Sequence, residues 1–221
     1  MSRVLVVGAH PDDEILGVGG TLAQHVRDGD EVHALVVADG ATSRYCGDMV
    51  SVLADSAARA AKVLGVASLH MEGLPDQRLD ALPLVDVTQA IEAIVADVRP
   101  RFIYTHFPGD VNADHGIVAK ATWVATRPYV APYLRRFAVF ETPSSTEWAW
   151  PTDGNDFMPN LFVDITATLE QKLAAMACYE SELRPYPHPR SSRALSERAA
   201  GWGSKVGRPA VEAFQVLREV R

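Results

Sequence analysis

The sequence predicts a Rossmann-like, three-layer α/β fold in which helices flank a mostly parallel sheet. Short apolar runs of the kind that form buried strands alternate with longer segments whose apolar residues recur every three or four positions. The alternation extends through the first 126 residues, and this order is typical of a parallel sheet with right-handed crossovers. The length of 221 residues suits one domain, 1–221, with a full hydrophobic core.

The first three elements follow directly from the apolar pattern. A strand is expected over 3–8, where an apolar run ends at Gly8. The helix expected over 14–28 has its apolar residues on one face, and it ends at Gly29. The next strand, over 31–38, is again apolar and stops at a turn.

The elements that follow carry their own start and stop signals. The Ala-rich residues 49–64 are expected to form a helix that ends at Gly65. Pro83 begins a predicted helix that runs to about Val98. Farther along the chain, the prolines within 183–190 exclude a regular helix or a central strand in that segment. The remaining strands are predicted over 67–71, 101–106, 137–141 and 161–164, and the remaining helices over 114–126, 167–180 and 192–201.

The composition excludes several classes of protein. The net charge is −7 without a basic run, which argues against nucleic-acid binding. The sequence has no apolar stretch of about 18 residues, so no membrane span is expected, and it has no leader that resembles a signal peptide. Cys46 and Cys178 lie too far apart for a disulfide framework, which favours a reducing, cytoplasmic location.

A histidine and three carboxylates follow the first strand directly. His10, Asp12, Asp13 and Glu14 stand at a strand-to-helix turn, where open α/β sheets bind their ligands. Imidazole and carboxylate groups together suit a divalent metal. A second interpretation is purely structural, since Asp12 or Asp13 would also cap the helix, and Pro11 is common at a helix start.

A second cluster of the same kind occupies residues 105–115 and also lies between a predicted strand and a predicted helix. By itself, Asp114 would be a helix cap and His115 an ordinary residue of the first turn. In a parallel sheet, however, both turns lie at the same edge, so Asp114 and His115 are expected to face His10, Asp12 and Asp13. The pairing of the two clusters favours a metal site.

The two clusters resemble a known family. His-Pro-Asp-Asp-Glu at 10–14, together with Asn-Ala-Asp-His at 112–115, is similar to the PIG-L/LmbE family of zinc-dependent N-acetyl-sugar deacetylases. Further similarity to the bacterial branch lies at Asp39-Gly40, at Pro75-Asp76, at 144–148 (Ser-Ser-Thr-Glu-Trp) and at 186–190 (Tyr-Pro-His-Pro-Arg). The resemblance therefore covers most of the chain. It implies removal of the acetyl group from a GlcNAc-like amino sugar or its nucleotide- or lipid-linked conjugate, with residues 130–221 completing the substrate pocket.

The resemblance also implies the roles of individual residues. His10, Asp13 and His115 match the zinc ligands, with one zinc per chain, although iron, cobalt or manganese would also suit such a site. Asp12 matches the general base, which takes a proton from zinc-activated water as that water attacks the amide.

Asn112 departs from the family pattern. Some members carry a histidine at this position, and the residue that matches Asp114 orients it. That histidine stabilises the oxyanion or protonates the leaving amine. Asn112 donates a hydrogen bond but no proton, so either Asp12 or another acid must protonate the amine. His188, held between two prolines, is our candidate, although a solvent-facing loop histidine is an equal reading. Asp114 is then expected to support a ligand histidine from behind.

The remaining candidates concern the substrate. By resemblance, Arg44, Asp76, Asn112, Glu147 and Trp148 are expected to contact the sugar. Without the resemblance, Arg44 and Asp76 would be solvated loop charges, and Trp148 a core or interface residue. The expected partner is a small N-acetyl sugar or conjugate, and a homo-oligomer is compatible with the aromatic-rich last third.

Three alternatives remain at this point. A zinc amidase acting on another amide conjugate would need the same ligands. A nucleotide- or dinucleotide-binding module is disfavoured because no glycine-rich phosphate loop follows the first strand, and Gly17, Gly19 and Gly20 come too late in the helix. A non-catalytic sugar-binding relative is disfavoured by the intact Asp12.

Overall fold

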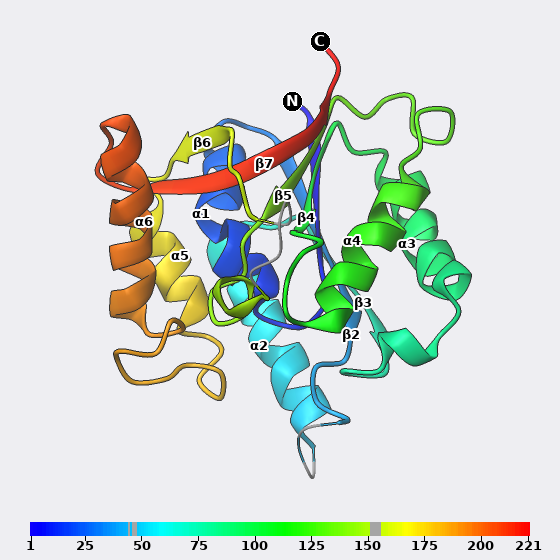
Figure 1. The fold of residues 1–221 in the computed structure, drawn as a ribbon, viewed down its shortest axis with the longest axis horizontal. Coiled ribbons are helices and arrows are strands. Elements are labelled where there is room, and N and C mark those ends of the chain that lie inside the picture. Colours follow the sequence, from blue (N-terminus) through cyan, green and yellow to red (C-terminus); the bar gives the residue numbers. More distant parts are fainter. Residues whose placement is uncertain (44, 46–47, 151–155) are drawn as a thin grey trace.

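The computed structural model describes residues 1–43, 45, 48–150 and 156–221. Its centre is a seven-stranded sheet with the order β3-β2-β1-β4-β5-β7-β6 (Figure 1). The strands are β1 (Arg3–Gly8), β2 (Glu31–Ala38), β3 (Ser68–Leu74), β4 (Phe102–His106), β5 (Arg136–Phe140), β6 (Leu161–Asp164) and β7 (Val211–Glu219). The first five are parallel, whereas β7 pairs antiparallel with both β5 and β6.

Helices cover both faces of the sheet, as Figure 1 shows. On one face lie α1 (Asp13–Arg27), α2 (Met49–Leu64), α5 (Leu169–Met176) and α6 (Ser192–Val206), and on the other α3 (Leu84–Val98) and α4 (Ala113–Ala125). Two short 3-10 turns, Leu79–Ala81 and Thr146–Trp148, lie in loops. The predicted three-layer α/β class is confirmed.

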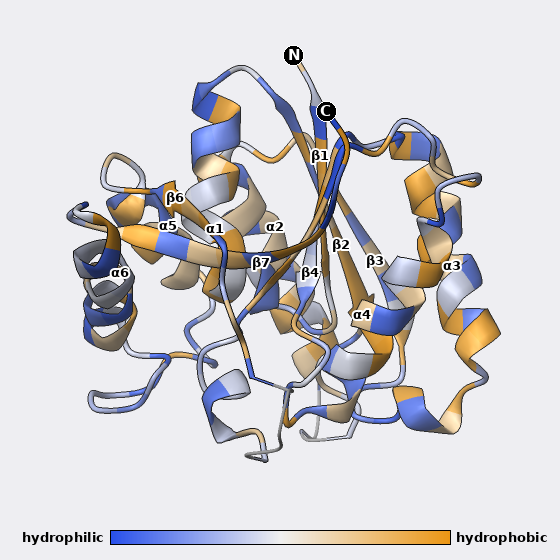
Figure 2. Cartoon of the chain, turned by 45° about the horizontal axis from the view of Figure 1, so that its top comes forward, coloured by the Kyte–Doolittle hydropathy of each residue, from blue (hydrophilic) through white to orange (hydrophobic). Residues whose placement is uncertain are grey.

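The alternating side chains of β1 explain the two layers. Val4 and Val6 pack into the core under α1 and α2, whereas Leu5 and Val7 pack into the core under α3 and α4. A strand buried on both faces reads as a continuous apolar run, which is why the sequence predicts it well. Figure 2 shows the same pattern, with hydrophobic residues concentrated along the strands.

The glycines inside α1 have a packing role. A Cβ atom at Gly17 would lie 2.1 Å from Phe140, and one at Gly20 would lie 2.8 Å from Ile165. The helix therefore lies close to β5 and to the loop after β6 because these positions lack side chains. These contacts account for the helical glycines, which the sequence already excluded as a phosphate cradle.

Most predicted elements lie within three residues of their observed bounds, but the last third differs. The helix expected over 167–180 ends at Met176, and the helix expected over 192–201 continues to Val206. The strand β7 was not predicted. Among the described residues, no helix combines the length and the apolar character needed to cross a membrane.

The sheet order positions the site. The chain goes from β1 to β2 on one side and later returns to β4 on the other side of β1. The loops that leave β1 and β4 therefore diverge at the carboxyl edge of the sheet, which is where open α/β sheets leave a crevice. Both clusters singled out in the sequence follow these two strands.

Candidate metal centre

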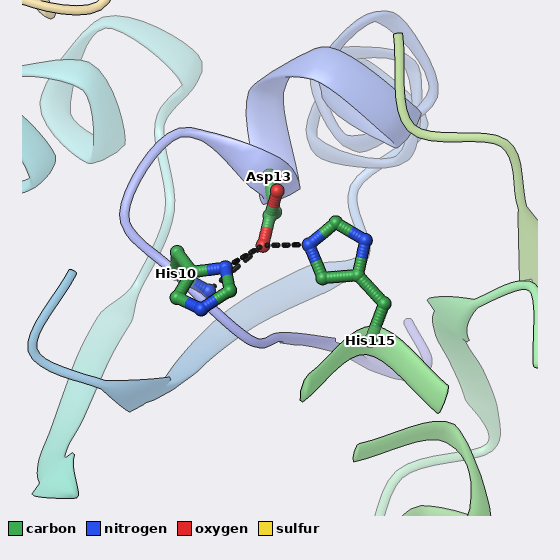
Figure 3. A group of neighbouring side chains, drawn as sticks. All are labelled: His10, Asp13 and His115. Atoms are coloured by element: carbon green, nitrogen blue, oxygen red, sulfur yellow. Dashed lines mark hydrogen bonds and ion pairs between the residues drawn. The ribbon is translucent and has the colours of Figure 1, made fainter. Parts of the chain in front are cut away.

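His10, Asp13 and His115 converge at this edge (Figure 3). His10 lies in the loop after β1, Asp13 begins α1, and His115 lies in the first turn of α4. One possible ligand atom from each residue lies within 4.8 Å of the others, and all three side chains are buried. Two imidazoles and one carboxylate at this spacing fit a divalent transition metal, with room for further ligands.

The turn before α1 separates the two neighbouring aspartates. Asp13 Oδ2 accepts a hydrogen bond from the backbone N–H of His10 at 2.8 Å, which directs this carboxylate toward the imidazoles. Asp12 has a φ of 106°, in the left-handed region that side chains other than glycine rarely adopt. Its carboxylate meets Arg190, with 3.2 Å between Oδ2 and the guanidinium. Adjacent carboxylates therefore serve different partners.

Each imidazole of the cluster lies between two carboxylates. His10 Nδ1 lies 3.4 Å from Asp13 Oδ2, and its Nε2 lies 3.0 Å from Asp114 Oδ2. His115 Nε2 lies 3.4 Å from Asp13 Oδ2, and its Nδ1 lies 3.2 Å from Asp110 Oδ1. Carboxylates behind ligand histidines fix the ring orientation and the tautomer in metal sites. The donor set and its support thus fit a metal ion.

A third histidine, His106, belongs to the support of the site. Its Nε2 accepts a hydrogen bond from the backbone N–H of Ala9 at 2.8 Å, so its Nδ1 carries the proton and donates to Thr142 Oγ1 at 3.0 Å. Burial, followed by the charge of His115, lowers the pKa of His106 to about 4. The neutral ring stacks on that of His115 with 4.0 Å between the centroids.

The carboxylates hold protons on the candidate ligands in the metal-free chain. Burial by itself disfavours a charged imidazole, but Asp114 and Asp13 raise the pKa of His10 to about 8. Burial also opposes the charge on His115, yet Asp13 and Asp110 raise its pKa to about 10. A metal that binds here must displace these protons.

At Asp12, in contrast to the two histidines, the effect of burial on the pKa outweighs that of the neighbouring opposite charge. Burial, and next the charge of Asp13, raise the pKa of Asp12 well above its usual range, although Arg190 opposes the shift. Arg190 also pairs with the buried Glu182 at 2.8 Å. A carboxyl group with a raised pKa is suited to take up a proton and to give it back during a reaction.

The pocket over the cluster is small, with a volume of about 80 Å³. The described residues that line it include His10, Asp12, Asp13, Gln77, Asn112, His115, Ser145 and Arg190. Asn112 caps α4, because its Oδ1 accepts a hydrogen bond from the N–H of Asp114 at 3.0 Å. Asp76 is fully buried, with its Oδ1 3.5 Å from His10 Nε2.

The other predicted substrate residues lie apart from the lining of this pocket. Glu147 pairs with Arg198 at 2.7 Å and accepts a hydrogen bond from the N–H of Ser144 at 2.9 Å. Trp148 is more than half exposed, and its ring centroid lies 6.2 Å from that of His188. His188 Nδ1 accepts from the N–H of Arg190 at 3.1 Å. Arg44 lies outside the described residues.

Sequence reasoning missed several members of the site. Asp110 stands in a Pro-Gly-Asp loop whose sequence is typical of an ordinary turn. In the structure its Oδ2 accepts a hydrogen bond from Thr146 Oγ1 at 2.6 Å. Gln77 has a φ of 55° and donates its N–H to Asp114 Oδ2 at 2.8 Å. Arg190 ends the Tyr-Pro-His-Pro-Arg run, and that run was the one available signal for it.

Comparison with known proteins gives consistent matches. The model of the PIG-L family, described as GlcNAc-PI de-N-acetylase, matches residues 5–126, which include both clusters. An uncharacterized deacetylase, YaiS of Escherichia coli (strain K12), is 30% identical to this chain, and the alignment covers 80% of this chain and 90% of YaiS. A 1D-myo-inositol 2-acetamido-2-deoxy-alpha-D-glucopyranoside deacetylase of Mycobacterium sp. (strain JLS) is 26% identical over 90% of this chain and 79% of its own.

The fold is also found among solved structures. The conserved protein TT1542 from Thermus thermophilus aligns with a TM-score of 0.78 and 26% identity, over 100% of this chain and 97% of that chain. The similarity therefore extends through the irregular last third.

Proposed function

Since the chain belongs to the PIG-L family of de-N-acetylases, we propose that it is a metal-dependent deacetylase that removes the acetyl group from an N-acetylated, GlcNAc-like amino sugar or its conjugate. The observation that carries the proposal is the buried group of His10, Asp13 and His115 beside a carboxyl group, Asp12, that faces the same pocket. The description of the family model and the name of the mycobacterial relative supply the substrate class.

We assign the metal site to His10, Asp13 and His115 and propose zinc as the metal, with one ion per chain. Zinc held there would act as a Lewis acid toward the amide and would make water acidic enough to attack at neutral pH. Asp110 and Asp114 support the assignment, because each holds one candidate ligand ring from behind.

Asp12 is the proposed general base. It takes a proton from the attacking water while the water oxygen bonds to the amide carbon, and it returns this proton to the nitrogen as the C–N bond breaks. Acetate and a free amine are the products. Because His188 is not among the described residues that line the pocket, Asp12 is the simpler proton donor. The positive charge of Arg190 orients the Asp12 carboxylate.

Polar groups around the pocket would orient the substrate. Asn112 uses its side-chain oxygen to cap α4, which leaves its amide group for the substrate carbonyl or a sugar hydroxyl. Asp76 is fully buried beside His10 and is not among the described residues that line the pocket, so its contact with the sugar stays a prediction. Contacts from Arg44, Glu147 and Trp148 stay predictions.

Elemental analysis combined with an acetate-release assay on N-acetylglucosamine conjugates tests the proposal. We expect about one zinc per chain in the wild type and in His70→Ala, and loss of zinc in His115→Ala. Asp12→Asn should keep its zinc but lose activity, whereas Asp28→Asn, at the exposed far end of α1, should keep both. If the wild-type protein holds zinc but releases no acetate, the proposed deacetylase activity is wrong. If His115→Ala retains its zinc, the proposed set of metal ligands is wrong.

A further inference from the structure

We propose that Glu182 is a positioning residue of the deacetylase, because it holds the guanidinium group of Arg190 against Asp12. This inference rests on the proposed function, in which Asp12 moves the proton, and it adds a residue from outside the pocket. Glu182 lies in the loop after α5 and is buried. It is not among the described residues that line the pocket over the metal site, so it can affect the reaction only through a neighbour.

The two carboxylates share one nitrogen of the guanidinium group. Arg190 Nη1 donates to Glu182 Oε2 at 2.8 Å and to Asp12 Oδ2 at 3.2 Å. Hydrogen bonds between charged groups are usually about 2.7–2.9 Å long, so the contact with Glu182 is the better one. An arginine side chain has several rotatable bonds, and the longer contact with Asp12 would hold it only loosely. Glu182 therefore sets the place of the guanidinium group, and Asp12 is oriented by a group that is already fixed.

Glu182 is itself firmly held. Its second carboxylate oxygen, Oε1, accepts a hydrogen bond from the Tyr45 hydroxyl at 2.9 Å. Its backbone N–H donates to the carbonyl oxygen of Tyr179 at 3.0 Å, in the turn that follows α5. Both oxygens of the buried carboxylate thus have partners, and these partners come from distant parts of the chain. Buried polar networks that are satisfied in this way are rigid, which makes Glu182 a suitable support.

The backbone at Arg190 is fixed as well. The N–H of Arg190 donates to His188 Nδ1 at 3.1 Å. The next residue, Ser191, caps α6 by accepting a hydrogen bond from the N–H of Ala194 at 3.1 Å. The main chain therefore fixes one end of the Arg190 side chain, and Glu182 fixes the other.

A displacement of Arg190 would reach the reacting group directly. Without Glu182, the guanidinium group can move toward Asp12 or into the pocket, and either movement shifts the carboxylate that Asp12 presents to the attacking water. A misplacement of about 1 Å can lower a rate by about a hundredfold. Glu182 is therefore expected to affect the chemical step and to leave substrate binding and metal binding unchanged.

Kinetics of Glu182 variants test the proposal. Glu182→Ala should lower kcat about tenfold to a hundredfold, with KM and zinc content unchanged. Glu182→Gln keeps an acceptor oxygen for Arg190 and should recover part of this loss. Glu180→Gln, which changes an exposed glutamate two residues earlier in the same loop, serves as the matched control and should behave as the wild type. An unchanged kcat in folded Glu182→Ala or Glu182→Gln would mean that the ion pair only stabilises the loop, and the proposal would be wrong.

A double-mutant cycle tests whether Glu182 acts through Arg190. In an Arg190→Met background the guanidinium group is already absent, so adding Glu182→Ala should lower kcat no further. If the two losses multiply instead, Glu182 affects the reaction by a route that does not involve Arg190, which would overturn the proposal.

Hydrogen exchange at the Arg190 side chain separates the proposal from the proposed function. Arg190 Nε is buried, and its N–H can be followed by heteronuclear NMR, with the signal assigned by its absence from Arg190→Lys. Exchange with water should become about tenfold faster or more in Glu182→Ala, and it should be unchanged in Glu180→Gln. Faster exchange supports the role of Glu182 even if the wild type releases no acetate, in which case the proposed function fails alone. Exchange at the wild-type rate in Glu182→Ala would show that Glu182 does not hold Arg190, whatever the activity.

Discussion

Zinc binding at pH 7 should release about two protons per chain, because both candidate ligand imidazoles are protonated in the metal-free protein. With a pKa of about 8, His10 carries about 0.9 of a proton at pH 7. With a pKa of about 10, His115 is fully protonated. A zinc ligand must be a neutral imidazole, so both protons must leave when the metal binds.

Titration calorimetry in buffers of different ionisation enthalpy measures this number. Imidazoles at their ordinary pKa of 6.5 would be mostly neutral at pH 7 and would together release only about half a proton. A measured release of one proton or fewer would therefore refute the reasoning that Asp13, Asp110 and Asp114 hold these rings charged. Titration of His70→Ala under the same conditions should give the wild-type count.

The same pKa shifts fix the sign of the pH dependence of stability. Because the folded-state pKa values of His10 and His115 exceed the ordinary 6.5, their contribution is fully present below about pH 6.5. It is lost as the pH rises through about 8 and then about 10. We therefore expect the thermal midpoint of the metal-free protein to fall between pH 7 and pH 10, and bound zinc to reduce this fall.

Three substitutions test other parts of the structure. Arg190→Met should lower kcat about tenfold to a hundredfold with unchanged zinc content, because the Asp12 carboxylate loses its partner, and Arg190→Lys should recover part of the loss; equal kcat in all three proteins would remove Arg190 from the mechanism. Asp114→Asn should weaken zinc binding about tenfold to a hundredfold in a chelator competition, whereas equal affinity would show that the carboxylate behind His10 is dispensable. Gly17→Ala should destabilise the chain by about 1–3 kcal/mol in denaturant unfolding, because its Cβ would overlap the Phe140 ring, and an unchanged midpoint would mean that this ring can move.

The parallel part of the sheet was predictable from the sequence, whereas its antiparallel edge was not. Strands buried on both faces, such as β1, consist of apolar runs that composition alone reveals. The strand β7 contains Glu212, a carboxylate that is buried inside the fold. It pairs with Lys172 at 2.6 Å and accepts hydrogen bonds from the N–H groups of Gly20 and Thr21. Its partners come from distant segments, and therefore no local pattern identifies this residue as buried.

In the candidate site too, some contacts were predictable from the sequence and others were not. The two motifs predict that His10 and His115 meet, because each follows a parallel strand and the carboxyl ends of such strands share one edge. The contact between Asp12 and Arg190 spans 178 residues and depends on how the loop after α5 returns to the edge. The course of a Pro-rich loop cannot be read from its sequence. The sequence therefore indicated His188 as the candidate residue, whereas the structure places Arg190 at the pocket.

The strained backbone at Asp12 explains how neighbouring carboxylates acquire different chemistry. Asp13 must enter α1 and direct its carboxylate toward the imidazoles, where His115 holds its pKa well below the usual range despite burial. If Asp12 continued the same helical path, the two charges would compete for the same partners. A φ of 106° turns Asp12 toward Arg190 instead, at a conformational cost of roughly 1–3 kcal/mol. The surrounding hydrogen bonds offset this cost, and the result is one carboxylate suited to bind a metal and one suited to move a proton.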